Sequence, residues 1–459
     1  MTTTQTGYSN KIRKESWFSR LNYDFNSKYL VSLSVRNDKS SRFSKDNNSG
    51  TFWSAGAGWN IHREDFLSHN SSVSQLKLRS SYGQVGNDGG NGSAPGWQAD
   101  RNLYSLSYDN AEEPGIYITQ QGNPDLTWES NNQFDVALEF GFFQNRISGV
   151  VEYFDRRTED MIFRVPTPGS AGVPNNGIYK NVGTMKNSGW EFGLNLGLIK
   201  NESFEWNLNL AATLYDTEMI KMPEGQEEII SNAQRLAKGH SPYDFWLRQW
   251  YGVDPTDGAP LYIQDPKINA NADTRTMADG TVVTTNHNNA LYDYSGTAIP
   301  DVGGYFSTEF KYNGFYLNAL FTYQIGGKIY DSNYASLMGS YAEGKAMHVD
   351  MLNAWKKPGD ITNVPIVSTQ NTSAAGAVSS RWLVDADYLA LKNAQFGYTF
   401  KQDDIKNLGI TALKVFVSGE NLFSATKRKG LEPAQSFNGH TSYRYTPSRI
   451  VALGLNVSF

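Results

Sequence analysis

The last nine residues of the chain, VALGLNVSF at 451–459, alternate between two kinds of side chain without an error. One row collects the large apolar side chains, which are Val451, Leu453, Leu455, Val457 and Phe459. The other row collects small or polar ones, which are Ala452, Gly454, Asn456 and Ser458. Because successive side chains of a strand point to opposite faces, this pattern predicts a β-strand with one apolar and one polar face.

The same alternation recurs throughout the chain, and no helical stripe of comparable length competes with it. It predicts about thirteen strands, at residues 17–25, 28–37, 51–61, 74–85, 130–143, 145–157, 186–199, 203–215, 301–312, 314–325, 388–400, 412–420 and 447–459. The composition agrees, since aromatic residues make up 13% of the chain and glycine counts 42. Residues of these kinds favour strands and turns, so the sequence predicts an all-β, antiparallel fold.

Short and long connections alternate between these strands. The tight connections are at 26–27, 144, 200–202 and 313, and two of middling length are at 62–73 and 401–411. The long polar connections are at 38–50, 86–129, 158–185, 216–300, 326–387 and 421–446. Loops this long count against an ordinary soluble domain. Short turns on one side and long loops on the other are typical of an outer-membrane barrel, so the sequence predicts a transmembrane β-barrel with long extracellular loops.

Composition excludes several classes of function. With 41 Lys and Arg against 46 Asp and Glu, the formal net charge is −5, and no basic run is longer than Lys427–Lys429, which argues against nucleic-acid binding. The chain has no cysteine, so it offers no disulfide and no thiolate chemistry. No window approaches 18 consecutive apolar residues, and the first sixteen residues lack the apolar core of a signal peptide.

The chain carries no arrangement that predicts catalysis. The six histidines show no metal-ligand spacing and are expected to be solvated loop residues. Acidic pairs such as Glu112-Glu113 and Asp403-Asp404 are expected to be solvated charge, and the glycine-rich stretch at 86–92 lacks the lysine and helix start of a phosphate-binding loop. We therefore expect no enzyme, no metal and no cofactor.

The longest connection contains one candidate for ligand contact. Its members are Tyr243, Trp246, Arg248, Trp250 and Tyr251. Aromatic side chains in such a loop stack against sugars or pack against peptide side chains. The competing interpretation is that they pack the loop onto the barrel rim or onto a partner protein.

Several stretches together resemble one known family. They are WFSRLNYDFNSKYLVSLSVRNDKSSRF at 17–43, LKLRSSYGQVGN at 76–87, NPDLTWESNNQFDVALEFGFFQNRISGVVEYFDRRTEDMI at 123–162, NVGTMKNSGWEFGLNL at 181–196, IPDVGGYFSTEFKYNGFYLNALFTYQIGGKIYD at 299–331, DYLALKNAQFGYTF at 387–400, VFVSGENLFSATKRKGLEP at 415–433 and TPSRIVALGLNVSF at 446–459. In this order they resemble the C-terminal barrel half of the SusC/RagA family of TonB-linked outer-membrane transporters. The segment at 216–298 departs from the family pattern, because GVDPTDGAPLYIQDPK stands where a stretch like a calcium loop is common, and no metal site is carried over.

The resemblance implies a barrel of 22 strands with an N-terminal plug, of which this chain would supply about thirteen. Residues 1–16 would then be a loop remnant or disordered tail, and residues 17–459 the C-terminal part of the barrel, with the plug and N-terminal domains absent. The implied function is import of oligosaccharides or peptides across the outer membrane of a Gram-negative bacterium. The implied partners are a SusD/RagB-like lipoprotein, TonB acting through the missing part, and outer-membrane lipid, and the family also allows a homodimer of the complete transporter.

Three expectations follow for a structure. The apolar rows, with Leu317, Phe321, Leu453 and Val457 as markers, should face outward, and Phe459 should act as a signal for membrane assembly. Because an odd number of strands leaves the first and last parallel, residues 17–25 and 450–459 should be the free edges of an open, curved sheet. The alternative is a soluble, secreted all-β carbohydrate-binding module, which would need no detergent for extraction.

Overall fold

A computed structural model describes residues 11–89, 98–110, 113–339, 344–368, 372–405, 407, 409–428 and 430–459. It divides into two compact units, the first built mainly from residues up to 195 and the second mainly from residues 241–459 together with 196–214. Among the described residues, no helix has the length and apolar character needed to cross a membrane.

The main element is an antiparallel sheet of thirteen strands that pair in chain order. Its strands are β1 (Lys14–Phe25), β2 (Tyr29–Ser40), β3 (Ser49–Asn60), β4 (Val73–Asn87), β7 (Glu129–Phe142), β8 (Ile147–Glu159), β11 (Thr184–Lys200), β12 (Phe204–Lys221), β21 (Val302–Tyr312), β22 (Phe315–Ile325), β25 (Tyr388–Thr399), β26 (Ala412–Thr426) and β27 (Ile450–Ser458). Each corresponds to one of the strands expected from alternation. The strand number and the antiparallel order are therefore confirmed.

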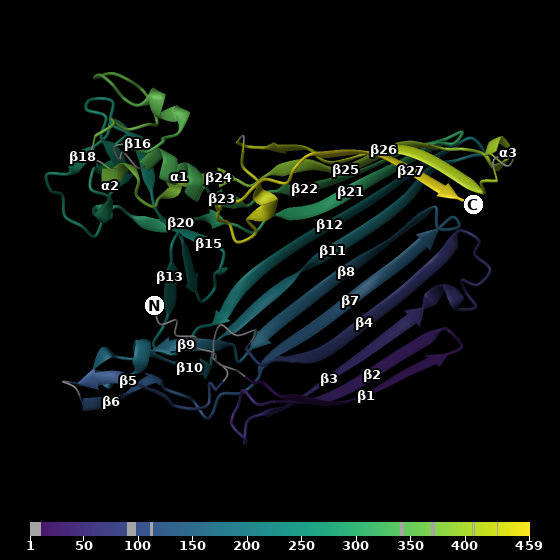
Figure 1. Ribbon diagram of the computed structural model, residues 1–459, viewed down its shortest axis with the longest axis horizontal. Helices are drawn as coiled ribbons and strands as arrows, with labels where there is room; N and C mark the ends of the chain where they lie inside the picture. The colour runs from purple at the N-terminus through teal and green to yellow at the C-terminus, as the bar shows by residue number, and fades with distance from the viewer. Residues whose placement is uncertain are drawn as a thin grey trace, which may run out of the picture. The chain divides into compact units, whose positions relative to one another are not determined.

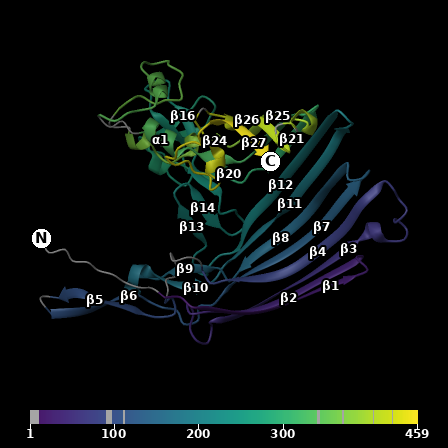
Figure 2. The same ribbon diagram turned by 45° about the vertical axis from the view of Figure 1, so that its right-hand side comes forward.

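In the first unit, the strands from β1 to β8 lie side by side, as Figures 1 and 2 both show. The turn between β1 and β2 is tight: Asn26 and Ser27 both adopt positive φ, and the amide of Lys28 donates to the carbonyl of Phe25 at 3.0 Å. Register carries the apolar rows across neighbouring strands. One such row runs through Phe25, Tyr29, Trp59, Leu78 and Leu138.

The second unit repeats this arrangement from β12 to β27. Directly paired residues form one apolar row, which runs Trp206, Phe310, Leu317, Phe396, Val417 and Leu453. The adjacent row, on the opposite face, runs Asn207, Glu309, Asn318, Gln395 and Ser418. Because pairing keeps the apolar row together over six strands and the polar row over five, this part of the sheet has one apolar and one polar face.

The apolar face encloses no core. Leu453 is 78% exposed and Leu317 is 39% exposed, whereas Phe321 and Val457 are half-buried. Phe321 stacks on Phe306 with ring centroids 4.7 Å apart, which is a contact along the face. The four marker residues are thus not packed together in a closed interior. That their side faces lipid stays a prediction.

The two terminal strands each have one neighbour in the described part of the chain. β1 pairs with β2 and β27 pairs with β26, and these two strands stand at the ends of the strand order. The expectation that residues 17–25 and 450–459 are free edges agrees with this order. β1 begins at Lys14, three residues before the expected start, whereas residues 1–10 of the expected tail lie outside the described residues.

The long connections contain more structure than their polar composition indicated. They carry the hairpins β5 (Leu103–Asn110) with β6 (Glu113–Gln120) and β9 (Ile162–Pro166) with β10 (Gly177–Asn181), and the pair β23 (Lys328–Tyr330) with β24 (Leu383–Asp385). Two small sheets join β13 (Glu228–Ser231), β14 (Gln234–Ala237), β15 (Asp244–Arg248) and β20 (Tyr292–Thr297), and β16 (Trp250–Val253), β17 (Pro260–Ile263), β19 (Val282–Thr284) and β18 (Thr274–Thr276). The α-helices are α1 (Ser332–Gly339), α2 (Thr372–Ala375) and α3 (Gln402–Ile405), and short 3-10 helices include η5 (Val349–Asn353) and η6 (Ser380–Trp382).

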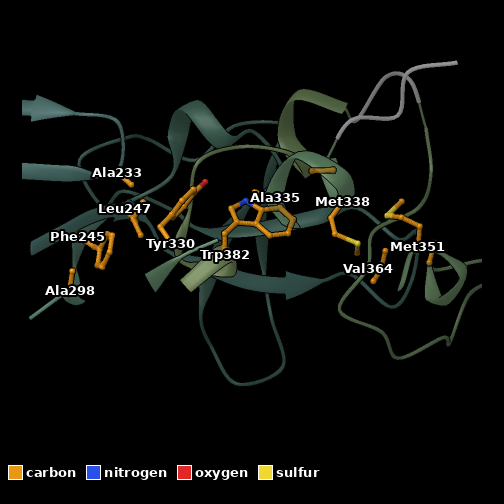
Figure 3. Packing of buried hydrophobic residues seen from close by; sticks show 12 residues of the cluster. Ala233, Phe245, Leu247, Ala298, Tyr330, Ala335, Met338, Met351, Val364 and Trp382 are labelled. Atoms are coloured by element: carbon orange, nitrogen blue, oxygen red, sulfur yellow. The ribbon is translucent and has the colours of Figure 1, made fainter. Parts of the chain in front are cut away.

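In the second unit these segments form a loop domain, which we define as residues 241–300, 326–387 and 427–446. Its core includes Phe245, Leu247, Met338, Met351 and Trp382, contributed by segments that lie far apart in the sequence. Figure 3 shows Trp382 at the centre of this core. The sequence predicted only polar loops here and missed this core. The apolar residues of these connections have no regular spacing in the sequence, so no local pattern predicts that they pack together.

Candidate functional site

Strand β15 positions the candidate ligand-contact residues. Its side chains alternate, so Phe245 and Leu247 point into the loop-domain core and are fully buried. Trp246 and Arg248 lie on the opposite face. The register pairs Trp246 with Tyr294 and Arg248 with Tyr292 of β20, which brings these four side chains to one face of a small sheet.

The three rings form an aromatic cluster, consisting of Trp246, Tyr292 and Tyr294. The Trp246 ring meets Tyr294 edge-on at a centroid distance of 4.8 Å and stacks near Tyr292 at 6.4 Å. The guanidinium of Arg235, on β14, lies 4.3 Å from the centre of the Trp246 ring. Cations in this position are held by the negative face of the ring, so Arg235 and the cluster stabilise each other.

Arg248 lies at the Tyr292 end of the aromatic cluster. Its guanidinium lies 4.8 Å from the centre of the Tyr292 ring. Its Nε donates to the carbonyl of His287 at 2.8 Å, and an outer nitrogen donates to the carbonyl of Val378 at 3.3 Å. Burial, together with the nearby positive charge of Arg248, lowers the pKa of His287. His287 is therefore neutral at pH 7, and Arg248 is the cation at this end.

The other three candidates lie elsewhere. Tyr243 packs against the loop-domain core. Trp250 packs edge-on against Tyr262 at 5.2 Å, while its indole nitrogen donates to Asn363 at 3.0 Å. Tyr251 donates its hydroxyl to Asp279 at 3.1 Å. The five residues therefore do not form one surface, and the structure brings together only Trp246 and Arg248.

Sequence reasoning missed Arg235, Tyr292 and Tyr294. A signal was present in the tyrosines, because they are two residues apart, as are Trp246 and Arg248. Two alternating segments of this kind share a face only if they pair with each other. Because the two segments are more than forty residues apart, the sequence did not predict that they pair. The three rings are half-buried and lie beside two guanidinium groups. Aromatic rings and guanidinium groups together are a combination suited to stacking with a planar or ring-shaped ligand.

The departure from a calcium-like loop has a structural counterpart in the turn at residues 254–259. Asp257 pairs with Arg275 at 2.7 Å, and Asp254 pairs with the same guanidinium. The hydrogen bond from Arg275 is the main cause of the lowered pKa of Asp257. Burial opposes ionisation of Asp254, but hydrogen bonds from Thr256 and Arg275 hold the pKa of this carboxyl below its usual value. An arginine thus supplies the positive charge between these two carboxylates.

Within the described ranges, no set of three or more His, Asp or Glu side chains is placed to hold a metal ion. Like His287, His440 is only partly solvated, which departs from the expectation that the histidines are solvated loop residues. Its ring lies 5.7 Å from Tyr330 and 5.8 Å from Phe245, and burial lowers its pKa. Of the two acidic pairs and the glycine-rich stretch, Glu112 and residues 90–92 lie outside the described residues.

The residue proposed as an assembly signal lies at the end of the last strand. β27 ends at Ser458, and Phe459 follows it with 89% of its surface exposed. Nothing in the described structure covers its ring. An exposed terminal aromatic side chain is accessible to another protein, and its role stays a prediction.

Comparison with known proteins identifies the family. The family of TonB dependent receptor-like β-barrels matches residues 1–422. The TonB-dependent receptor P3 of Formosa agariphila is 27% identical over 100% of this chain and 47% of its own length. The TonB-dependent receptor SusC of Bacteroides thetaiotaomicron is 26% identical over 99% of this chain and 44% of its own length.

A solved structure agrees with these relatives. The structure of the RagAB peptide transporter superposes with a TM-score of 0.83 and 28% identity, and the match covers 98% of this chain and 48% of that one. The chain thus spans about half the length of the relatives it matches. The paired strands, the two-faced sheet and these matches lead to one conclusion: the chain belongs to the TonB-dependent receptor β-barrel family and is of the SusC/RagA type.

Proposed function

We propose that this chain is the barrel portion of a TonB-dependent outer-membrane importer for oligosaccharides or peptides. One observation carries the proposal. Six paired strands hold an apolar row from Trp206 to Leu453, five of them hold a polar row from Asn207 to Ser418 beside it, and the apolar row encloses no core. Lipid covers an apolar row of this kind, and water in a lumen satisfies a polar one. The similarity to SusC and to the RagAB transporter supports the same function.

The importer acts with partners that this chain alone does not supply. TonB engages a part of the transporter outside this chain, and a SusD/RagB-like surface lipoprotein works with it at the cell surface. Further strands pair with β1 and β27, because an unpaired backbone group in lipid costs several kcal/mol. The chain by itself is not expected to transport.

Extraction from cells tests this function against its alternative. A transporter carrying this chain is expected in the outer-membrane fraction, to need detergent for extraction, and to migrate faster on SDS gels before boiling than after. A soluble, secreted carbohydrate-binding module would appear in the medium without detergent. Recovery of the folded protein in the soluble fraction would overturn the importer.

Assembly provides a second test. Phe459→Asp in the same transporter is expected to lower its amount in the outer membrane several-fold, because the exposed terminal ring would no longer be recognised. Phe437→Asp, a change at another exposed phenylalanine, is the control and should leave the amount unchanged. Equal membrane levels for the two variants would remove the signal role of Phe459.

We further propose that the aromatic cluster contacts the substrate. Trp246→Ala is expected to weaken substrate binding about fivefold, which corresponds to about 1 kcal/mol for a ring contact. Tyr445→Ala removes a fully exposed ring of the loop domain and serves as the control. Binding by glycans and by peptides is measured in parallel, so the same experiment identifies the substrate class. If Trp246→Ala binds substrate as tightly as the wild type, the aromatic cluster packs the loop and does not contact the substrate.

A further inference from the structure

A groove lies on the polar face of the first unit. Its position follows from a row of paired residues that crosses β1, β2, β3, β4 and β7, strands that lie side by side in Figures 1 and 2. The members of this row are Asn22, Ser32, Gly56, Ser81 and Asp135. Each stands three residues along its strand from a member of the apolar row that runs from Phe25 to Leu138, so it points to the opposite face. Small side chains predominate, which leaves space for a groove of about 470 Å³ along this face.

Asp135 differs from the other residues that line the groove. Only 6% of its surface is exposed. The side-chain amide of Gln133 donates to its two carboxylate oxygens at 3.2 and 2.9 Å, and the hydroxyl of Ser81 donates to one of them at 3.4 Å. All of these donors are neutral. Within the described ranges, no lysine or arginine forms an ion pair with Asp135.

The charges of the groove do not balance. Its lining includes one basic side chain, Arg36, and two acidic ones, Asp38 and Asp135. The Nε of Arg36 donates to both carboxylate oxygens of Asp38, at 2.6 and 2.7 Å. This pair is complete in itself, so the negative charge of Asp135 is left over.

Two further arginines face the same side of the sheet, and each has its own partner. Arg79 donates to Glu139 at 2.9 Å and to Glu152 at 2.6 Å. Arg156 holds its guanidinium 4.8 Å from the centre of the Phe154 ring. Neither one reaches the buried carboxylate of the groove, which therefore lacks a cation in the part of the chain that the structure describes.

The groove supplies groups that suit a cation. A buried charge costs free energy unless an opposite charge joins it, and ionisable side chains on membrane-spanning segments mark the pathways of substrates. The hydroxyls of Ser34 and Ser54, 2.6 Å apart, have oxygens that accept hydrogen bonds. The ring of Phe52 lines the same groove, and the face of an aromatic ring attracts positive charge.

We propose that this groove binds a positively charged group of the substrate, either a protonated amine or a guanidinium, with Asp135 as its counter-ion. The inference rests on the proposed importer function, in which the polar face meets the lumen that the substrate crosses. Asp135 is then a specificity-determining residue, because it favours substrates that carry a positive charge over neutral ones.

Uptake of matched probes tests the proposal in cells that express the complete transporter. One pair is a short fluorescent peptide containing lysine and the same peptide containing norleucine. The other pair is a labelled oligosaccharide containing one glucosamine unit and the same oligosaccharide with that unit N-acetylated. The charged member of the transported pair is expected to enter roughly tenfold faster at low probe concentration, the size expected for one charge-assisted hydrogen bond.

Two variants locate the effect. Asp135→Asn should reduce uptake of the charged member to that of the neutral one. Asp155→Asn is the matched control and should retain the preference, because Asp155 lies on the opposite face of the neighbouring strand β8, where it pairs with Arg157 and Lys186. Faster migration of the unboiled variants on SDS gels confirms that the barrel folds.

The outcomes separate this site from the function on which it rests. Equal uptake of the charged and neutral members by the wild type overturns the cation site, whatever the variants do. Loss of uptake of both members by a folded Asp135→Asn transporter also overturns it, because Asp135 would then stabilise the transporter itself. A wild type that takes up neither pair overturns the proposed import of peptides or oligosaccharides.

Discussion

The strands of the large sheet and the loop domain use apolar residues in opposite ways. Leu453 on β27 leaves 78% of its surface exposed, whereas Leu247 on β15 is fully buried. The sheet keeps its apolar residues in rows along one face, and neighbouring strands extend those rows by pairing. The loop domain gathers its apolar residues from separate segments around Trp382. The sheet therefore depends on its surroundings to cover its apolar side chains, while the loop domain covers its own.

The largest effect is expected in the loop-domain core. Trp382 is buried, its indole nitrogen donates to the carbonyl of Ala377 at 2.9 Å, and its ring meets Tyr334 edge-on. Trp382→Ala should destabilise the loop domain by about 3–5 kcal/mol, because it leaves a large cavity and an unpaired carbonyl. The measurement is limited proteolysis of the detergent-purified transporter, in which cleavage should shift to the loop domain while the unboiled barrel still migrates faster.

The matched control for this change is Tyr445→Ala. Tyr445 is a fully exposed ring of the same domain, and its removal should change stability by less than about 0.5 kcal/mol. If Trp382→Ala also abolishes the faster migration of the barrel, the loop domain and the strands fold as one cooperative unit. The loop domain would then not be stable independently of the strands, contrary to the difference between the two regions proposed here.

The next largest effect is expected on the apolar face of the sheet. Leu317 lies between Phe310 and Phe396 in the apolar row. Leu317→Arg should cost about 2–4 kcal/mol in a lipid bilayer, the range for arginine at mid-depth on a lipid-facing strand. The change in the free energy of unfolding is measured by reversible unfolding of the transporter in lipid vesicles.

The control for the apolar face is Asn318→Arg, one residue along the same strand. Because it changes the opposite, polar row, it should cost less than about 1 kcal/mol. Similar costs for the two variants would show that both faces meet the same environment, which would sink the barrel interpretation in favour of a soluble sheet.

A smaller effect is expected at the turn held by Arg275. Arg275→Ala leaves Asp254 and Asp257 without their shared cation and should destabilise the loop domain by about 1–3 kcal/mol at pH 7. The exposed Lys267→Ala, in the same connection, is the control and should have no effect. The rate of proteolytic cleavage in the loop domain is the measurement.

The pH dependence of this turn has a definite sign. Both carboxyls have a lowered pKa in the folded protein, so their contribution is present above the unfolded value of about 3.9 and is lost as the pH falls through the folded values. The difference between wild type and Arg275→Ala should therefore be largest near pH 7 and shrink below about pH 4. A difference that grows in acid would contradict the assigned ion pairs.

How much of the fold was predictable differs between the two regions. All thirteen strands of the large sheet were expected from alternation, because a strand with one apolar face shows its period in the sequence itself. Several extend further than expected, and β12 reaches Lys221, since backbone pairing continues where the alternation of side chains stops. The small strands of the loop domain were missed. Strands of three to six residues are too short to show a clear period.

The candidate site was predictable only in part. The structure brings Trp246 and Arg248 to one face, and their contact with a ligand stays a prediction. Trp250 and Tyr251 lie elsewhere, because β15 ends at Arg248 and the next strand, β16, pairs with β17 in another small sheet. Tyr292, Tyr294 and Arg235 reach the cluster through strand pairing in β14, β15 and β20. Pairing between short strands far apart in sequence has no local signal.

The sequence alone determined the number and order of the long strands, which of their side chains share a face, and the family, since each depends on neighbouring residues or on their order. The tertiary structure decided which loop residues meet. It placed Arg275 between two carboxylates and His440 beside Phe245. The physical reason is that alternation is a local property of the backbone, whereas a core and an interface form only when distant segments close on one another.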